Sequence, residues 1–413
     1  MKKSIIFAYT CVFLLIFAFP IVRGLSSAKL LMLLLILRLM LSPNGKMLNN
    51  CLRDFNFRSR NYFRAHILLL FVTFLTTVLY LQFDFSLFSK VLSSFILFPV
   101  SYILLRRCSE YIEVDKAIVY SFVLQSILII LCSINETFYD LTAPFRAEMS
   151  DNHMESYGRL RGNSISGYQF FGIASMYSFV LLYTIMRLER FKYKIVILFL
   201  LSVGAIISGR FSIVGIIVGF VFLLIRNFYI GRISKLFVYI LSVALIIFIT
   251  ISGIYYYADM IEDPLMSQVI NHYIIQPLDS VLVDGDFQTS STDALAEMYK
   301  MQDIKPYLLF GSGRYTNPDG SYFGLVDAGY LRTLGYYGVL GFNLLIYCVY
   351  HICFKSRNSM DKYTKWAFFI LFLVLNYKGD IQVYSNNIVP IIVGFFFFNH
   401  DCVNVQKYEK YEK

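Results

Sequence analysis

The sequence predicts an all-α protein that crosses a membrane about twelve times. Of its 413 residues, 57% are hydrophobic and only 15% are charged, whereas soluble domains carry roughly 25% charged residues. No single soluble core could bury so much apolar surface, which argues against an ordinary globular enzyme. Apolar runs such as 31–38 and 195–208 also lack the period-two alternation of a membrane β-barrel.

The apolar blocks define the predicted spans, because a helix needs about 20 apolar residues to cross a bilayer. Spans 1–9 form a transmembrane bundle over 1–255, spans 10–12 lie within 328–400, and 401–413 is a tail. The twelve blocks are 4–22, 25–42, 66–83, 87–105, 117–133, 169–187, 194–208, 211–225, 236–255, 328–352, 365–378 and 384–400.

The distribution of charge predicts the orientation of these spans. If the N-terminus is cytoplasmic, most of the 37 Lys and Arg residues fall in inward segments and most of the 27 Asp and Glu residues in outward ones. This is the positive-inside bias, so the net charge of +10 indicates topology and not nucleic-acid binding. Both termini are therefore predicted to be cytoplasmic. The first block has no small-residue cleavage site, so we interpret it as a span and not as a signal peptide.

Two predicted outward segments, 134–168 and 256–327, are too long to be simple connectors, since loops longer than about 12–15 residues are usually functional or disordered. In the larger one, 292–302 is predicted to be a short helix. The turn GSGRY (311–315) and a second turn at 317–320 follow. We therefore expect any chemistry on the outer, periplasmic face.

Arginines on this face predict a binding site for a di-anion. Arg210 lies in the short turn SGRFS between spans 7 and 8, Arg159 and Arg161 lie in RLRG before span 6, and Arg332 lies about one turn inside span 10. Guanidinium groups bind phosphate bidentately and stay charged. Two of these arginines also have a structural interpretation. Arg210 could extend to lipid headgroups, and Arg332 could form an ion pair with Asp327.

Three other basic residues are assigned differently. Arg314, within GSGRY, is added to the predicted pyrophosphate-binding set. Arg38 and Lys90 lie near the ends of their spans, from which a long side chain can extend to the interface. We interpret these last two as structural.

The order of these motifs resembles the O-antigen polymerase and ligase superfamily, the Wzy-type enzymes. RLRG precedes a span, SGR joins two spans, and a long loop ends in GSGRY and then DAGYLRTLGYYGVLG (327–341). The resemblance covers about 117–352, and its strongest part combines Gly311, Gly313 and Tyr330 with the glycines that follow in the next span. Ligases of this family have His-Asn where this chain has Asp327-Ala328, which favours a polymerase.

The resemblance implies a GT-C-like fold in the bacterial inner membrane with a periplasmic active face. It implies inverting, metal-independent glycosyl transfer without a cofactor, in which a growing glycan leaves undecaprenyl pyrophosphate for the non-reducing end of an incoming lipid-linked repeat unit. Its partners would be the lipid-linked oligosaccharide, membrane lipid and a chain-length regulator protein. The essential arginines of the family correspond to Arg159 and Arg210, with Arg161 as an alternate. Gly311, Gly313 and Tyr330 form the expected substrate loop.

The chemistry also needs a base. A carboxylate would take the proton of the acceptor hydroxyl, while arginines stabilise the departing pyrophosphate. Asp327 is the first candidate because it lies at the mouth of a span near Arg332, although a salt bridge or a helix N-cap is the alternative. Asp319, Glu297 and the acidic residues of 134–155 remain open. Gly335, Gly338 and Gly341 predict either close packing by small residues or a flexible helix.

Three functions are consistent with this pattern. They are a polymerase of lipid-linked repeat units, a ligase that transfers polymer to lipid A core, and a flippase for lipid-linked oligosaccharide. A transporter is expected to have repeat-related halves and ionisable residues near the bilayer midplane. Here ionisable residues are sparse within the spans and one outer loop, 256–327, dominates, which favours the polymerase.

Overall fold

The computed structural model describes residues 2–22, 25–40, 46–81, 83–147, 164–231, 290–300, 304–358 and 360–399, with four isolated positions between 248 and 256. Apart from these positions, the predicted span 236–255 lies outside the described residues, as do 257–289 and 301–303 of the loop 256–327, RLRG at 159–162 and the tail 401–413. The chain divides into two compact units. Unit 1 contains Met1–Ala18, Ser27–Ser121 and Leu295–Lys413, and unit 2 contains Phe19–Ser26 and Phe122–Ala294.

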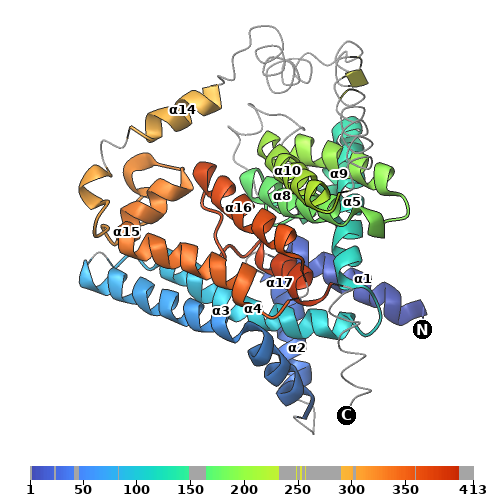
Figure 1. Ribbon diagram of the computed structural model, residues 1–413, viewed down its shortest axis with the longest axis horizontal. Helices are drawn as coiled ribbons and strands as arrows, with labels where there is room; N and C mark the ends of the chain where they lie inside the picture. Colours follow the sequence, from blue (N-terminus) through green and yellow to red (C-terminus); the bar gives the residue numbers. More distant parts are fainter. Residues whose placement is uncertain are drawn as a thin grey trace. The chain divides into compact units, whose positions relative to one another are not determined.

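The described chain is helical, as the sequence predicts for an all-α membrane protein (Figure 1). Five helical segments are long and apolar enough to cross a membrane, and they begin at residues 49, 86, 114, 210 and 329. The α-helices are α1 (Lys2–Phe17), α2 (Ser27–Met40), α3 (Lys46–Leu79), α4 (Ser86–Cys108), α5 (Val114–Ile134), α6 (Glu136–Thr142), α8 (Phe171–Met186), α9 (Lys194–Ser208), α10 (Ile213–Tyr229), α14 (Ser290–Met298), α15 (Gly329–Tyr350), α16 (Lys362–Lys378) and α17 (Val389–Phe397).

Short elements connect these helices. Two strands, β1 (Pro20–Val22) and β2 (Leu25–Ser26), form an antiparallel ribbon after α1. The 3-10 turns are η1 (Ala143–Phe145), η3 (Leu188–Arg190), η4 (Arg210–Ser212), η6 (Lys305–Tyr307) and η7 (Phe323–Leu325), and a π-helical segment, η8 (His351–Lys355), extends α15. The ribbon is a small addition to the predicted all-α fold.

In unit 1, α3 and α4 form an antiparallel pair that packs against α15. The pair is held by a buried hydrogen-bonded chain in which His66 contacts Tyr62 at 3.0 Å and Ser94 at 3.2 Å. Farther along α3, Thr73 and Thr77 each bond a tyrosine hydroxyl of α15 at 2.6 Å. Polar groups inside an apolar bundle must be paired in this way, so these bonds fix the register of α3 against both neighbours.

Different segments of the chain contact one another at the two ends of unit 1. At one end Arg58 pairs with Asp54 at 3.1 Å, and the N–H of Arg357 donates to the carbonyl of Arg58. This bond joins 43–65, between predicted spans 2 and 3, to 353–365, between spans 10 and 11, and a cytoplasmic N-terminus would place both segments on the inward side. The turn between α3 and α4, the start of α15 and the end of α16 meet at the other end. Segments that the sequence places on one side of the membrane therefore lie at one end of unit 1.

The last predicted span, 384–400, contains only the nine-residue helix α17, all of it buried. Nine helical residues extend about 14 Å, which is too short for a hydrocarbon core of about 30 Å. The residues before it, 381–388, form turns, and such backbone is tolerated at membrane depth only where protein covers it. The structure thus replaces the predicted seventeen-residue span with a short helix buried inside unit 1.

Span 10 is also different from its prediction, because α15 is broken. Gly338 has φ 67° and ψ −173°, a conformation that only glycine adopts readily. As a result, the rings of Tyr330 and Phe342 lie 5.5 Å apart, although an unbroken helix would separate these residues by about 18 Å. The chain therefore reverses sharply at Gly338 between a short arm, 329–337, and a longer arm.

Unit 2 is built around α8, in which fourteen of sixteen residues are buried. Small residues let its neighbours approach closely: a Cβ added at Gly215 of α10 would lie 2.2 Å from the carbonyl oxygen of Ser178, and one at Gly209 would lie 2.8 Å from Ala174 Cβ. Close helix packing by small residues is common in membranes. It fixes the turn between α9 and α10 against α8.

Candidate functional site

The loop that contains GSGRY is seated in the break of α15. The N–H groups of Ser312 and Gly313 donate to the carbonyl oxygens of Gly335 and Tyr336, at 2.7 and 3.2 Å, and the N–H of Val339 donates to the carbonyl of Leu308 at 2.9 Å. These bonds pair backbone groups that the broken helix leaves open. The glycine-rich motifs of the loop and of span 10 are therefore two halves of one contact.

The glycines of the predicted substrate loop serve this close approach. At Gly311, φ is +80° and an added Cβ would lie 2.1 Å from the carbonyl oxygen of Tyr336. At Gly338, an added Cβ would lie 2.3 Å from the carbonyl oxygen of Leu309. The sequence suggested close helix–helix packing for Gly338, but the close approach that the structure shows there is to the loop and not to another helix.

After the motif, the chain forms the predicted turn at Asn317–Gly320. The N–H of Gly320 donates to Asn317 O at 2.9 Å, and Thr316 and Tyr322 form an antiparallel bridge. Asp84, in the turn between α3 and α4, accepts the N–H groups of Tyr315 at 2.6 Å and Thr316 at 2.7 Å. The sequence-predicted turn is confirmed, and Asp84 fixes its base.

This small hairpin encloses Arg332, whose side chain is only 5% exposed. The guanidinium carbon lies 4.1 Å from the ring centroid of Tyr315 and 3.6 Å from that of Tyr322, a double cation–π arrangement. Nη1 lies 3.9 Å from Oδ1 of Asp327. Nε and Nη2 are buried and have no hydrogen-bond partner among the described residues. Because an unpaired buried charged donor is costly, these two nitrogens indicate a binding position for an anion.

Tyr315 also connects Arg332 to a second pair of charges. Its hydroxyl donates to Asp380 and accepts from Nζ of Lys90 at 3.0 Å. Tyr384 donates to the other oxygen of Asp380 at 2.8 Å. Burial raises the pKa of the Tyr315 hydroxyl well above its ordinary value, so this hydroxyl keeps its proton.

Asp327 is placed at the edge of this cluster. Its side chain is 63% exposed, yet the adjoining protein removes enough water to raise the pKa of its carboxyl, against the opposing charge of Arg332. The N-cap of α15 is Ala328, and the helix start has no side-chain cap. The structure therefore excludes the N-cap interpretation of Asp327 and keeps its contact with Arg332.

Arg210 lies in unit 2, in the turn η4 between α9 and α10. Phe211 packs against Phe171 with ring centroids 5.5 Å apart, so the turn lies at the N-terminal end of α8. Arg159 and Arg161 lie outside the described residues. Arg332 belongs to unit 1 and Arg210 to unit 2, so each is described within its own unit.

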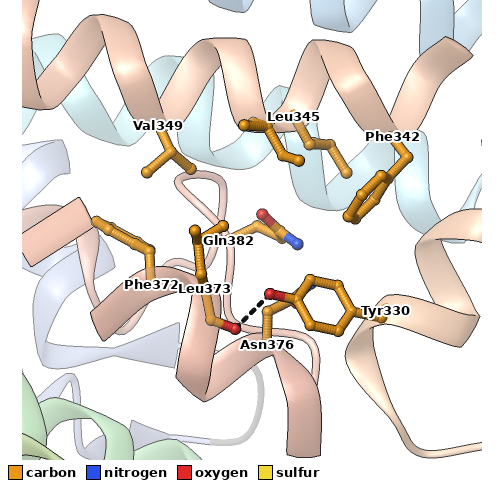
Figure 2. A pocket seen from close by; sticks show the side chains of 9 residues that line it. Tyr330, Phe342, Leu345, Val349, Phe372, Leu373, Asn376 and Gln382 are labelled. Atoms are coloured by element: carbon orange, nitrogen blue, oxygen red, sulfur yellow. Dashed lines mark hydrogen bonds between the residues drawn. The ribbon is translucent and has the colours of Figure 1, made fainter. Parts of the chain in front are cut away.

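The remaining predicted site residues lie beside the cluster. The guanidinium carbon of Arg314 is 5.8 Å from the ring centroid of Phe323. Tyr330 donates to the carbonyl of Leu373 at 2.6 Å and lines a mostly apolar pocket in the bend of α15 against α16 (Figure 2). Asn376 also lines it, and both polar atoms of its buried amide lack a partner among the described residues.

Sequence reasoning missed Asp84, Lys90 and Asp380. Lys90 was interpreted only as a structural residue that extends to the lipid interface, and Asp84 and Asp380 were not among the predicted site residues. The available signal was topological, since alternation of the spans places all three residues at the same predicted outer end as Asp327. Their pairing with Tyr315 needed the structure, because 225 residues separate Lys90 from Tyr315.

Comparison with known proteins adds no identification. No protein-family model, no curated protein sequence and no solved structure matches this chain.

Proposed function

We propose that the protein is a polymerase of lipid-linked oligosaccharide repeat units. It transfers a growing glycan from undecaprenyl pyrophosphate to the non-reducing end of an incoming lipid-linked unit, at the periplasmic face of the bacterial inner membrane. The observation that carries this proposal is Arg332, a nearly fully buried arginine whose Nε and Nη2 lack partners among the described residues.

The geometry of Arg332 suits a phosphate. Nε and Nη2 lie on one edge of the guanidinium and can bind two oxygens of one phosphate together, while the rings of Tyr315 and Tyr322 hold its plane. The site lies at the ends of apolar helices, the depth at which a lipid headgroup lies in a bilayer. A lipid-linked pyrophosphate has its charge at this depth and its sugar in water.

The roles of the residues follow from the reaction. Arg332 stabilises negative charge on the departing pyrophosphate, an electrostatic role worth about 10²–10³-fold in rate for one donor. Asp327, exposed and with a raised pKa, accepts the proton of the attacking hydroxyl. Both oxygens of Asp380 already accept tyrosine hydroxyls, so Asp380 is the poorer base. Arg314 remains a proposed member of this site. Arg210, Arg159 and Arg161 belong to unit 2, and their role in binding pyrophosphate remains a separate prediction.

The charge balance refines the original expectation of a purely cationic pocket. Among the described residues of the cluster, Arg332 and Lys90 are matched by Asp327 and Asp380. Binding must then depend on unpaired donors at fixed positions and not on net positive charge. Such preorganised donors act without reorganisation when the charge develops.

The test is complementation of a strain that lacks this gene. Arg332→Gln should leave single repeat units on the lipid A core at normal protein level, because the leaving group loses its donors. Arg332→Lys keeps the charge without the planar fork and should give shortened chains. Arg107→Gln, which removes an exposed ion pair with Glu110, is the matched control and should give full-length polymer.

The deletion strain itself separates the three functions. Single repeats on the core support a polymerase, polymer retained on undecaprenyl lipid identifies a ligase, and loss of both products identifies a flippase. A full-length polymer ladder from Arg332→Gln would contradict the proposed site.

A further inference from the structure

We infer that Lys90 is the second cation of the Arg332 site and makes it selective for a diphosphate over a monophosphate. This inference rests on the proposed function, because it assumes that Arg332 binds a phosphate ester. It assigns a ligand-binding role to a residue whose sequence position suggested only a structural one.

The two cations converge on one tyrosine. Nζ of Lys90, from α4, lies 4.5 Å from the ring centroid of Tyr315, and the guanidinium carbon of Arg332, from α15, lies 4.1 Å from the same centroid. The two helices thus bring an ammonium and a guanidinium to a single ring. Two linked phosphates need two such donors a few ångströms apart, whereas one phosphate is satisfied by the fork of Arg332 alone.

The direction of the ammonium is set by a chain of hydrogen bonds. A tyrosine hydroxyl has one proton, and that of Tyr315 is donated to Asp380, so the oxygen must accept from Lys90. Lys90 has three N–H donors, and the bond to Tyr315 is its only hydrogen bond within the described residues. Two donors are therefore left for a ligand.

Lys90 is the more accessible of the two cations. The residue is exposed, whereas the side chain of Arg332 is only 5% exposed. Leu92 and Ile96 on α4 are also exposed, at 36% and 53%, but at about 100° per residue they lie about 160° and 120° around the helix from Lys90. A diphosphate that enters this end of unit 1 can thus contact Lys90 before it reaches Arg332.

The test measures binding of two probes by the purified full-length protein in lipid nanodiscs. The probes are radiolabelled farnesyl diphosphate and farnesyl monophosphate. The wild-type protein should bind the diphosphate more tightly. Lys90→Gln should weaken diphosphate binding by about tenfold or more, the effect of one charge-assisted hydrogen bond, and should leave monophosphate binding unchanged. Retained monophosphate binding also reports that the variant is folded.

Two further variants complete the design. Lys90→Arg keeps a cation and should restore the preference for the diphosphate. Lys362→Gln is the matched control, because Nζ of Lys362 also lies near a tyrosine ring, 5.0 Å from the centroid of Tyr363. Lys362 is the first residue of α16, whereas Asp380 of the Arg332 site follows the last residue of this helix. This variant should bind both probes like the wild type.

The outcomes separate the two proposals. If Lys90→Gln keeps the wild-type preference, or weakens both probes equally, the inference about Lys90 is wrong while the Arg332 site stands. If the wild-type protein binds neither probe, or if Arg332→Gln binds both as the wild type does, the anion site and the proposed function fail together.

Discussion

Replacement of Gly338 by alanine is the sharpest test of how this site is built. The residue has φ 67° and ψ −173°, which costs about 1–3 kcal/mol for any other residue. The new Cβ would also lie 2.3 Å from Leu309 O, 2.6 Å from Leu309 C and 2.7 Å from Gly311 N. All three are backbone atoms, so no side-chain rotation relieves the contact and the loop must move.

Movement of the loop would break the three hydrogen bonds that seat it in α15, from Ser312, Gly313 and Val339. Each is worth about 0.5–1.5 kcal/mol, so with the backbone strain of about 1–3 kcal/mol the total loss is about 2.5–7.5 kcal/mol. Tyr315 lies just beyond this contact and covers Arg332. We therefore expect Gly338→Ala to lose chain extension as well as stability.

The assay is SDS titration of the purified protein in mixed micelles, followed by the fluorescence of its single tryptophan, Trp366, which packs against Phe354 at 4.7 Å in unit 1. Gly320→Ala is the matched control, because Gly320 has φ +84° in the same loop and nothing within 4 Å of an added Cβ. It should lose only about 1–2 kcal/mol. Equal unfolding midpoints for the two variants, together with normal chain extension by Gly338→Ala, would refute the reasoning.

Two further predictions concern carboxylates outside the spans. Burial raises the pKa of Asp84, but hydrogen bonds from Ser86, Thr316 and Tyr315 outweigh it and lower the pKa below the ordinary 3.8. This stabilisation is present above pH 3.8 and is lost as pH falls through the folded-state pKa, so Asp84→Asn should be less stable than wild type at pH 7 and converge with it under acid in the same titration. Equal stability at neutral pH would show that Asp84 does not hold the hairpin. For Asp327, the pKa is raised above 3.8 by desolvation, and only the carboxylate accepts a proton, so chain extension in vitro should fall on acidification at a pH above 3.8. Asp327→Asn should lack activity at every pH, and an unchanged pH profile in this variant would remove Asp327 as the base.

Several features of this protein follow from local sequence alone. Long apolar blocks form helices in a membrane because only internal hydrogen bonding satisfies their backbone there. By length and composition, five of the described helical segments meet this requirement, although the one that begins at residue 329 is broken at Gly338. The turn at 317–320 was predictable because Asn, Asp and Gly favour turn conformations. Arg332 was recognisable as a candidate because an arginine near the end of an apolar span needs a partner or a polar cavity.

Local sequence could not reveal where the helices break or end. The block 328–352 reads as one span, yet it reverses at Gly338 because the loop 308–313 supplies backbone partners to the opened turn. The block 384–400 reads as another, yet it contains nine helical residues buried by their neighbours. In both cases the residues that decide the outcome lie outside the apolar block. A mean hydropathy calculated over the block contains no information about them.

The sequence by itself determined that this chain is an α-helical membrane protein, that its charged residues lie mostly outside the apolar blocks, and that Arg332 and Asp327 are close. Only the tertiary structure decided which groups complete the cluster. Lys90 meets Tyr315 across 225 residues, and Tyr315 meets Asp380 across 65. The physical reason is that burial makes each of these charges depend on partners from other helices, and packing alone selects those partners.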